Sequence, residues 1–291
     1  MRGQRRPEEG SQVDEDCVVF LHIPKTAGTT MASSLVINYP PERTINMDFA
    51  FGRPVADIED RIPPERRARL RLLWGHLPYG VHRYIPRPCR YITVLRNPIA
   101  RGISAYKYIR NNPRHWDHQR VVEERIDMAG FFANDELMEK RRNRQTRQLC
   151  NNQVGEMDRE DLEEAKRNLE RFLVVGLTER FEETFVLVRR ALRLRIPFYV
   201  TRLVSPQMSV SERAIGLIRE QNQLDLELYG FAHELFNERV ARHGKSLGLE
   251  VSMFKALRPL SRAAGHGSVE RALVGLSHHR RQRQRGNVHR S

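Results

Sequence analysis

The chain has 291 residues, of which 40% are hydrophobic and 30% charged, so it can bury one large core or at most two modest ones. No apolar run approaches the length of a membrane span, and residues 1–16 lack the apolar segment of a secretory signal, so the sequence predicts a cytoplasmic protein. The formal net charge of +14 favours anionic ligands, and residues 251–291 hold nine Lys or Arg against one acid, Glu270.

Residues 17–39 predict a strand, a loop and a helix in that order. Residues 17–23 are apolar and rich in β-branched side chains, which is typical of a buried strand, and a proline ends the run. From Met31 onward the apolar residues recur at helical spacing. The loop between them therefore ends at a helix N-terminus, where free backbone N–H groups and the helix dipole favour an anion.

Small residues and one lysine fill this loop. Gly28 allows the backbone to approach a ligand, and Lys25 supplies a mobile positive charge. Thr29 and Thr30 add hydroxyl donors. An ordinary tight turn from strand to helix has a similar composition. Lys25 also precedes Gly28 by three residues, whereas in the nucleotide-triphosphate loop G-x-x-x-x-G-K-[ST] the lysine follows the glycines.

The PKTAGTT sequence of this loop resembles the 5′-phosphosulfate loop of sulfotransferases. It is most similar to the loop in the branch that contains the heparan sulfate and chondroitin O-sulfotransferases and their bacterial relatives. The resemblance implies that 3′-phosphoadenosine 5′-phosphosulfate (PAPS) is the sulfuryl donor. The residues that it assigns to PAPS binding are Lys25, Thr26, Ala27, Gly28, Thr29 and Thr30.

Residues 72–74 predict a short strand, and Gly75-His76 follows at its carboxyl end. Ligands of open α/β sheets bind at this end of the strands, so we expect His76 to face the same crevice as Lys25. A lone histidine is more often structural than catalytic. In the sulfotransferase branch, however, a Gly-His pair at a similar distance before the second PAPS motif carries the catalytic base, and His76 precedes Arg96 by twenty residues. The resemblance implies that His76 is the general base. If His76 is structural instead, the other candidates for the general base are His22, His82 and Glu179.

Residues 91–95 predict a second buried strand, which ends at Arg96. Asn97 is a good N-cap for the following helix, and Pro98 fits its first position. Seven residues make almost two helical turns, so Ser104 lies nearly beneath Asn97, and its hydroxyl can face the same anion as Arg96. A capped helix alone would explain the pattern. The segment also resembles the sulfotransferase 3′-phosphate motif R-[DN]-P-x-x-R-x-x-S, which implies that Arg96 and Ser104 bind the 3′-phosphate.

Two further segments are candidates for contacts with the acceptor. Residues 111–134 are polar, and we expect them to form a loop region over the site that includes Trp116. Residues 143–147 resemble a short segment on the acceptor side in the same sulfotransferase branch. That resemblance implies substrate contacts from Arg144, Gln145 and Arg147.

The sequence predicts no metal site. His115 and His118 have a spacing that could bind a metal on a helix, but no third ligand accompanies them. Cys17, Cys89 and Cys150 are odd in number and unclustered in the sequence. This pattern argues against a disulfide framework or a zinc site and fits a reducing compartment.

The second half of the chain predicts a helix over residues 161–172, a buried strand over 173–177 and a helix from Phe181, with Thr178 placed to cap it. A long helix over residues 214–243 closes the pattern. We interpret residues 17–250 as a single P-loop-like α/β domain with a central, mostly parallel sheet flanked by helices. Residues 1–16 are predicted to be a disordered tail, and residues 251–291 a basic, partly disordered one.

The resemblance implies transfer of a sulfuryl group from PAPS to a hydroxyl of an acceptor, in particular a carbohydrate. Two alternatives remain open. An ATP-dependent phosphotransferase is disfavoured by the position of the lysine and by the lack of an evident carboxylate for magnesium. A protein that binds nucleic acid or another polyanion through the basic tail is disfavoured because the terminal arginines are not interleaved with aromatic residues.

Overall fold

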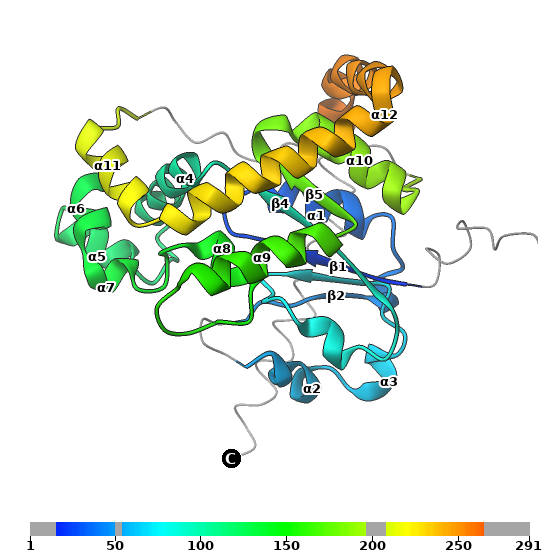
Figure 1. Cartoon of the computed structure of the whole chain (residues 1–291), viewed down its shortest axis with the longest axis horizontal. Coiled ribbons are helices and arrows are strands. Elements are labelled where there is room, and N and C mark those ends of the chain that lie inside the picture. Colours follow the sequence, from blue (N-terminus) through cyan, green and yellow to red (C-terminus); the bar gives the residue numbers. More distant parts are fainter. Residues whose placement is uncertain (1–15, 50–53, 196–207, 265–291) are drawn as a thin grey trace, which may run out of the picture.

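The computed structural model describes residues 16–49, 54–195 and 208–264. These residues contain one sheet of five parallel strands in the order β2-β3-β1-β4-β5, flanked by helices (Figure 1). The strands are β1 (Cys17–Leu21), β2 (Thr44–Asn46), β3 (Leu72–Gly75), β4 (Cys89–Leu95) and β5 (Val174–Leu177). The predicted α/β class with a mostly parallel sheet is confirmed.

The central strand β1 shows why the sheet is covered on both faces. Its five residues are at most 2% exposed, which requires packing above and below the sheet. From β1 the chain goes to β2 and β3 on one side of the sheet and later returns to β4 and β5 on the other. Open parallel sheets bind ligands where the strand order reverses, at the carboxyl ends of the strands. The ends of β1, β3 and β4 therefore mark the expected position of the site.

The helices vary widely in length. Those before β5 are α1 (Gly28–Val36), α2 (Ile58–Arg61), α3 (Pro64–Arg67), α4 (Pro98–Asn111), α5 (His118–Glu123), α6 (Met128–Ala133), α7 (Asp135–Met138), α8 (Arg144–Leu149) and α9 (Arg159–Arg171). Those after β5 are α10 (Phe181–Leu192), α11 (Glu212–Glu220) and α12 (Gln223–Ala264). Short 3₁₀ turns are η1 (Pro41–Arg43), η2 (Val55–Asp57), η3 (Val81–Tyr84) and η4 (Thr178–Arg180).

A second, smaller hydrophobic cluster lies outside the sheet, among α4, α5, α6, α7 and α11. Its members include Tyr106, Val121, Phe131, Met138 and Ile218. The prediction of a loop over residues 111–134 is therefore wrong in part, because α5 and α6 lie within that segment. Each of these helices has six residues, which is less than two turns and too short to produce helical periodicity in the sequence.

The two predicted helix caps have different outcomes. The Asn97 side chain accepts hydrogen bonds from the backbone N–H groups of Ile99 and Ala100, so its predicted role as the N-cap of α4 is confirmed. The predicted Thr178 cap of α10 is wrong, because no side chain caps that helix. The Thr178 hydroxyl instead donates to the Leu95 carbonyl at 3.0 Å and ties the end of β5 to the end of β4.

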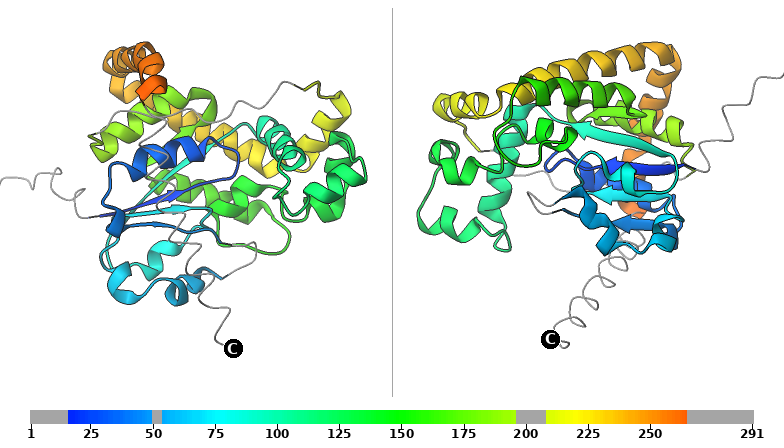
Figure 2. Two further views of the ribbon diagram at one scale, coloured as in Figure 1. Left: turned by 180° about the vertical axis from the view of Figure 1, so that it is seen from behind. Right: turned by 60° about the horizontal axis from the view of Figure 1, so that its bottom comes forward.

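The long helix α12 bends at Gly244, whose φ of 57° lies in the left-handed region that favours glycine. Figure 2 shows the second half of the helix, in orange, turned away from the yellow first half. Val251 and Phe254 in this second half pack against the main core. The predicted domain boundary after residue 250 therefore falls inside a packed helix, and residues 265–291 of the predicted tail lie outside the described residues.

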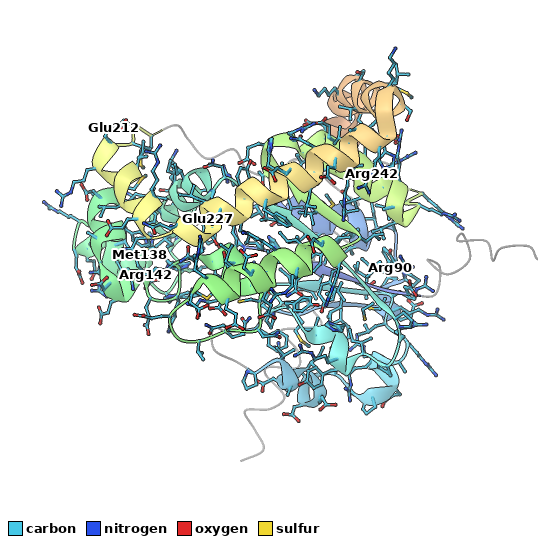
Figure 3. All side chains as sticks on the ribbon, viewed as in Figure 1. Arg90, Met138, Arg142, Glu212, Glu227 and Arg242 are labelled. Carbon is cyan, nitrogen blue, oxygen red and sulfur yellow. The ribbon has the colours of Figure 1, made fainter. Side chains whose placement is uncertain are left out.

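Charged side chains cover the outside of the domain (Figure 3). One ion pair, between Arg159 and Glu227, joins α9 to α12 where the two helices cross. Over the ranges that the structure describes, no helix is long and apolar enough to span a membrane.

Candidate active site

Three segments of the chain meet at the carboxyl ends of the central strands. Residues 22–27, which follow β1, form the Lys25 loop. The His22 backbone N–H of this loop donates to the Gly75 carbonyl at 2.9 Å, at the end of β3. The Arg96 guanidinium, which follows β4, donates to the Lys25 carbonyl at 3.0 Å. His76, the Lys25 loop and Arg96 therefore lie side by side.

The Lys25 loop has a backbone shape that suits an anion. Lys25 and Ala27 both have left-handed conformations, with φ of 72° and 61°. Alternation of this kind curls the chain and can turn successive N–H groups into one concavity. The Thr26 hydroxyl donates to the Ile23 carbonyl at 2.8 Å and is buried, so it stabilises the curl. The contribution of Thr26 to PAPS binding stays a prediction.

Gly28 begins helix α1, and its lack of a side chain makes room for His22. A Cβ atom at residue 28 would lie 1.7 Å from Cδ2 of the His22 ring. The sequence predicts glycine here for close approach of a ligand, and the structure adds a second reason, which is the packing of this imidazole. Burial, together with the neighbouring His76, lowers the pKa of His22 to about 3. His22 is therefore neutral at physiological pH.

Lys25 and Arg96 place two positive charges at this curl. The Lys25 ammonium lies 4.1 Å from the centre of the Tyr108 ring, a cation–π contact. Burial lowers the pKa of Lys25, and the Arg96 charge lowers it further. Burial also lowers the pKa of Arg96, although the Glu179 carboxylate opposes that effect. Two desolvated cations that repel each other are stabilised when an anion binds between them, so these residues fit a phosphate or sulfate group.

Gln145 holds the Arg96 backbone in place. Its side-chain oxygen accepts from the Arg96 N–H at 3.0 Å, and its side-chain nitrogen donates to the Arg96 carbonyl at 2.9 Å. Gln145 is fully buried and braces the residue before the N-cap of α4, so this is the role that the structure gives it. Its direct contact with the substrate stays a prediction.

Asp225 in α12 fixes the helix that carries Gln145. Its carboxylate accepts from the backbone N–H groups of Gln145 and Thr146 at 3.1 and 2.8 Å, and from the Thr146 hydroxyl at 2.9 Å. Arg101, the second arginine of the 3′-phosphate motif, is buried 3.8 Å from the same carboxylate and donates to Asn222 at 3.2 Å. Arg101 therefore joins α4 to α12.

The other two predicted substrate contacts differ in exposure. Arg147 is 3% exposed and donates to the Gly155 carbonyl at 2.7 Å, so it supports the loop before α9, and its contact with the substrate stays a prediction. Arg144 is half-buried at the start of α8. Burial and the charges of Arg101 and Arg147 lower the pKa of Arg144 to about 10. Of these three residues, Arg144 stays a candidate for binding an anionic group.

Asn97, the N-cap of α4, contacts the segment after β5. Ser104 is half-buried, two turns after the N-cap. The Asn97 N–H donates to a Glu179 carboxylate oxygen at 2.9 Å, and the Tyr229 hydroxyl donates to the other oxygen at 3.0 Å. Glu179 therefore joins the start of α4 to α12, a role that no sequence motif indicates.

His76 differs from the alternative bases in its surroundings. Its side chain is 35% exposed at the end of β3. His82 lies in an aromatic cluster, where Nδ1 is 2.9 Å from the Tyr91 hydroxyl, and burial lowers its pKa. His22 is packed against α1, and both Glu179 oxygens accept structural hydrogen bonds. Among the four candidates, His76 has the geometry that best suits proton transfer with a bound acceptor.

A row of aromatic rings leads outward from Lys25. The His115 ring lies edge-on to the Tyr108 ring, with centroids 5.9 Å apart, and packs at 4.2 Å against the Trp116 ring. Trp116 is 80% exposed, although it lies near the proposed site. An exposed aromatic surface of this kind can bind an apolar face of a ligand.

Comparison with known proteins identifies the family. The family model described as galactose-3-O-sulfotransferase matches residues 2–265. The chain belongs to the galactose-3-O-sulfotransferase family. The predicted resemblance to carbohydrate O-sulfotransferases is confirmed by this match.

Several relatives of this galactose-3-O-sulfotransferase family member are heparan-sulfate enzymes by name. Heparan-sulfate 6-O-sulfotransferase 2 of Danio rerio is 27% identical over 77% of this chain and 59% of that protein. Heparan-sulfate 6-O-sulfotransferase 1 of Homo sapiens is 27% identical over 77% of this chain and 66% of that protein. The chain thus spans about three-fifths to two-thirds of the length of these relatives. Among solved structures, mouse sulfotransferase SULT7A1 complexed with PAP is 15% identical, with a TM-score of 0.36 over 74% of this chain and 70% of that one.

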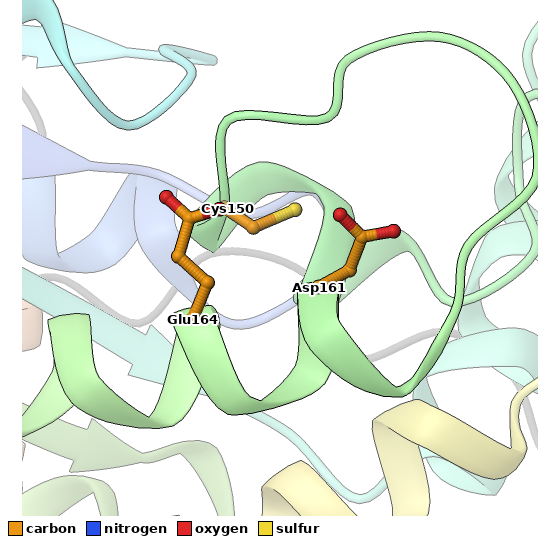
Figure 4. Close-up of side chains that lie close together, drawn as sticks. All are labelled: Cys150, Asp161 and Glu164. Atoms are coloured by element: carbon orange, nitrogen blue, oxygen red, sulfur yellow. The ribbon is translucent and has the colours of Figure 1, made fainter.

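One group of three potential metal ligands occurs within the described part of this sulfotransferase-family chain. Cys150, Asp161 and Glu164 bring their ligand atoms within 4.8 Å of one another (Figure 4). Both carboxylates accept hydrogen bonds from the loop before α9, from Asn151 and Asn152. Burial raises the pKa of the Cys150 thiol to about 12, which disfavours the thiolate that a metal needs. We interpret this group as a brace for the loop.

The other two cysteines, Cys17 and Cys89, are apart in the sequence but are register partners on β1 and β4, and both are free thiols.

Gln148 is a further residue that the sequence does not reveal. Its side-chain nitrogen donates to the His22 and Leu77 carbonyls, both at 2.9 Å. This amide holds the Lys25 loop against the segment that follows His76. A glutamine in an Arg- and Gln-rich segment resembles a solvated surface residue, so only the tertiary structure shows this role.

Proposed function

We propose that this chain transfers the sulfuryl group of PAPS to a hydroxyl of a carbohydrate acceptor. The observation that carries the proposal is that the Lys25 loop contacts both Arg96, through the Lys25 carbonyl, and His76, through the His22 ring, at the ends of the three central strands. Membership of a carbohydrate O-sulfotransferase family supports the donor and the class of acceptor. PAPS supplies an activated sulfuryl group, so the protein needs mainly to position the reactants and to stabilise charge.

Each residue of the site has one part in this reaction. The N–H groups of the Lys25 loop and of the first turn of α1 hold the 5′-phosphosulfate, and the Arg96 guanidinium and Ser104 hydroxyl hold the 3′-phosphate. His76 takes the proton of the acceptor hydroxyl as the acceptor oxygen bonds to sulfur. Lys25 stabilises the negative charge on the phosphate oxygen as its bond to sulfur breaks. The other product is adenosine 3′,5′-bisphosphate (PAP).

The aromatic row supports a sugar as the acceptor. A pyranose ring has an apolar C–H face as well as hydroxyl groups, and that face packs well against a flat aromatic side chain. Trp116 offers such a surface, and Tyr108 links it to Lys25 through the cation–π contact. An acceptor that packs against this row would extend toward the proposed phosphosulfate position.

The choice of nucleotide tests the proposal directly. PAP should bind about 10- to 100-fold more tightly than 5′-AMP, because a charge-assisted contact to the 3′-phosphate is worth about 1.5–3 kcal/mol. Arg96→Ala should remove most of that difference, whereas Arg66→Ala, an exposed arginine on α3, should keep it. Thermal shifts with PAP, 5′-AMP, ATP and an oligonucleotide provide the measurement. Equal affinity for PAP and 5′-AMP would contradict a 3′-phosphate site, and a preference for ATP or for the oligonucleotide would favour one of the two alternative functions.

Removal of the exposed Trp116 ring should weaken binding of the acceptor and leave binding of PAPS unchanged. We expect Trp116→Ala to raise the acceptor KM by about two- to tenfold, since aromatic packing of this kind is worth about 0.5–1.5 kcal/mol. Trp116→Phe, which retains a flat ring, is the matched control and should stay close to the wild type. Initial rates at saturating PAPS provide the measurement. A Trp116→Ala protein with an unchanged acceptor KM would show that the acceptor does not use this surface.

A further inference from the structure

Asp48 lies beside His76 because the chain after β2 stays paired with the chain after β3. The Met47 N–H donates to the Trp74 carbonyl at 2.9 Å, and the Phe49 N–H donates to the His76 carbonyl at 3.1 Å. These two bonds continue the parallel pairing past the end of β2, and the second also lies past the end of β3. Asp48, between them, therefore faces the residues that follow β3.

Gly75 permits the close approach of these two segments. Its φ of 140° lies in a region that side-chain-bearing residues rarely adopt. A Cβ atom at this position would lie 2.0 Å from the Met47 carbonyl oxygen and 3.0 Å from Oδ1 of Asp48. The glycine of the Gly-His pair thus serves the contact between Asp48 and His76, as well as ending the strand.

The Asp48 carboxylate contacts His76 at two nitrogen atoms. Its Oδ1 atom accepts a hydrogen bond from the His76 backbone N–H at 3.0 Å and lies 3.4 Å from Nδ1 of the imidazole. A carboxylate oxygen at Nδ1 favours the tautomer that carries its proton there, which leaves the lone pair on Nε2. The Arg61 guanidinium donates to the Asp48 carbonyl at 3.0 Å and fixes the Asp48 backbone.

His22, which packs against the His76 ring, adds no positive charge beside it. The two imidazole rings lie 4.7 Å apart and are tilted by 38°. His22 is neutral at physiological pH because burial lowers its pKa to about 3. Asp48 and Lys25 act on the charge of His22 with opposite signs, and the Arg61 guanidinium lies at the Asp48 backbone. The Asp48 carboxylate is in contact with the His76 ring and stabilises a proton there.

We propose that Asp48 is a positioning residue that holds His76 with Nδ1 protonated and Nε2 directed to the acceptor hydroxyl. The same carboxylate stabilises the imidazolium that forms when Nε2 takes the proton. No proton moves to Asp48 in this scheme, since the proton leaves the acceptor oxygen and remains on Nε2. The inference rests on the proposed role of His76 as general base and adds the residue that orients it.

The Asp48→Asn variant distinguishes a role in positioning His76 from a purely structural role. The asparagine oxygen can still accept from the His76 backbone N–H, while the negative charge is lost. We expect kcat to fall by about 10- to 100-fold, with the acceptor KM and PAP affinity within about twofold of the wild type. The acidic limb of the pH–rate profile should move to lower pH by about one unit or less, because the protonated imidazole loses its counter-charge. Asp60→Asn, an exposed acid on α2, is the matched control and should match the wild type.

Direct observation of the imidazole gives a readout that does not depend on turnover. Long-range ¹H–¹⁵N spectra, assigned by comparison with His76→Gln, should show the Nδ1-protonated tautomer of His76 in the wild type and a titration midpoint at lower pH in Asp48→Asn. An unchanged midpoint, or equal losses of turnover, PAP affinity and melting temperature, would overturn the proposal and make Asp48 a structural brace. A wild type that shows this tautomer but no sulfuryl transfer would sink the proposed function and leave the Asp48–His76 contact supported.

Discussion

His76→Ala should lower the turnover of the enzyme by about 10²–10⁴-fold while PAP affinity stays close to that of the wild type. The proton comes from the acceptor and not from the nucleotide, so the loss appears in kcat. The rate of the wild type should rise with pH through an acidic limb in the range where histidines titrate, about pH 5–8, because the base must be neutral. That limb should vanish in the variant. His22 does not confuse the assignment, because burial lowers its pKa to about 3, well below this range.

His233→Ala provides the control for this experiment. His233 is exposed on α12 and pairs with Asn237, so its removal should leave both the rate and the pH profile unchanged. A fully active His76→Ala protein would show that His76 is structural. The search for the base would then return to His22, His82 and Glu179, although each of these is packed against neighbours or hydrogen-bonded to them in the structure.

Lys25→Ala should reduce both binding and turnover. We expect PAP affinity to fall by about tenfold or more, since a charge-assisted contact is worth about 1.5–3 kcal/mol. A further loss of about 10²–10³-fold in kcat follows, because the lysine charge interacts most strongly with the leaving oxygen in the transition state. Isothermal titration with PAP and single-turnover kinetics with PAPS measure the two losses separately.

The pattern of losses distinguishes Lys25 from Arg96. Lys25→Ala should weaken PAP and 5′-AMP alike, because both carry the 5′-phosphate, whereas Arg96→Ala should weaken PAP much more than 5′-AMP, which keeps only the smaller loss from the broken bond to the Lys25 carbonyl. Tyr108→Phe retains the aromatic ring under the ammonium and is expected to keep near-normal affinity, which controls for the cation–π contact. An unchanged kcat in Lys25→Ala, at saturating PAPS, would contradict the role of Lys25 in stabilising the leaving group.

Local signals in the sequence predicted four of the five strands that the structure describes, whereas the three-residue strand β2 (Thr44–Asn46) was missed. Apolar runs predicted β1, β4 and β5 because parallel strands are buried on both faces. Asn97 and Pro98 predicted the start of α4 because a cap depends on residues within one turn. His76, Lys25 and Arg96 follow three neighbouring strands, so topology alone brings them together.

Long-range polar contacts could not be predicted in this way. Asp48 and His76 are 28 residues apart, Gln145 and Arg96 are 49 apart, and Asp225 and Gln145 are 80 apart. Each contact joins polar residues that look like surface positions when they are considered alone, because propensity and periodicity are properties of short windows. For the same reason, Gln145 and Arg147 resembled ligand contacts in the sequence, whereas their partners are a backbone amide and a carbonyl of the chain itself.

The position of Asp225 has a consequence for the order in which the protein matures during synthesis. Asp225 in α12 fixes α8, whose Gln145 holds the Arg96 backbone. Tyr229, also in α12, fixes Glu179, which holds the Asn97 backbone. A nascent chain that has been synthesised as far as β5 contains every residue assigned to PAPS binding, but it lacks the hydrogen bonds from Asp225 and Tyr229. The sheet can therefore assemble on the ribosome before the nucleotide pocket is complete, and high-affinity PAP binding should first arise when α12 has been released from the exit tunnel.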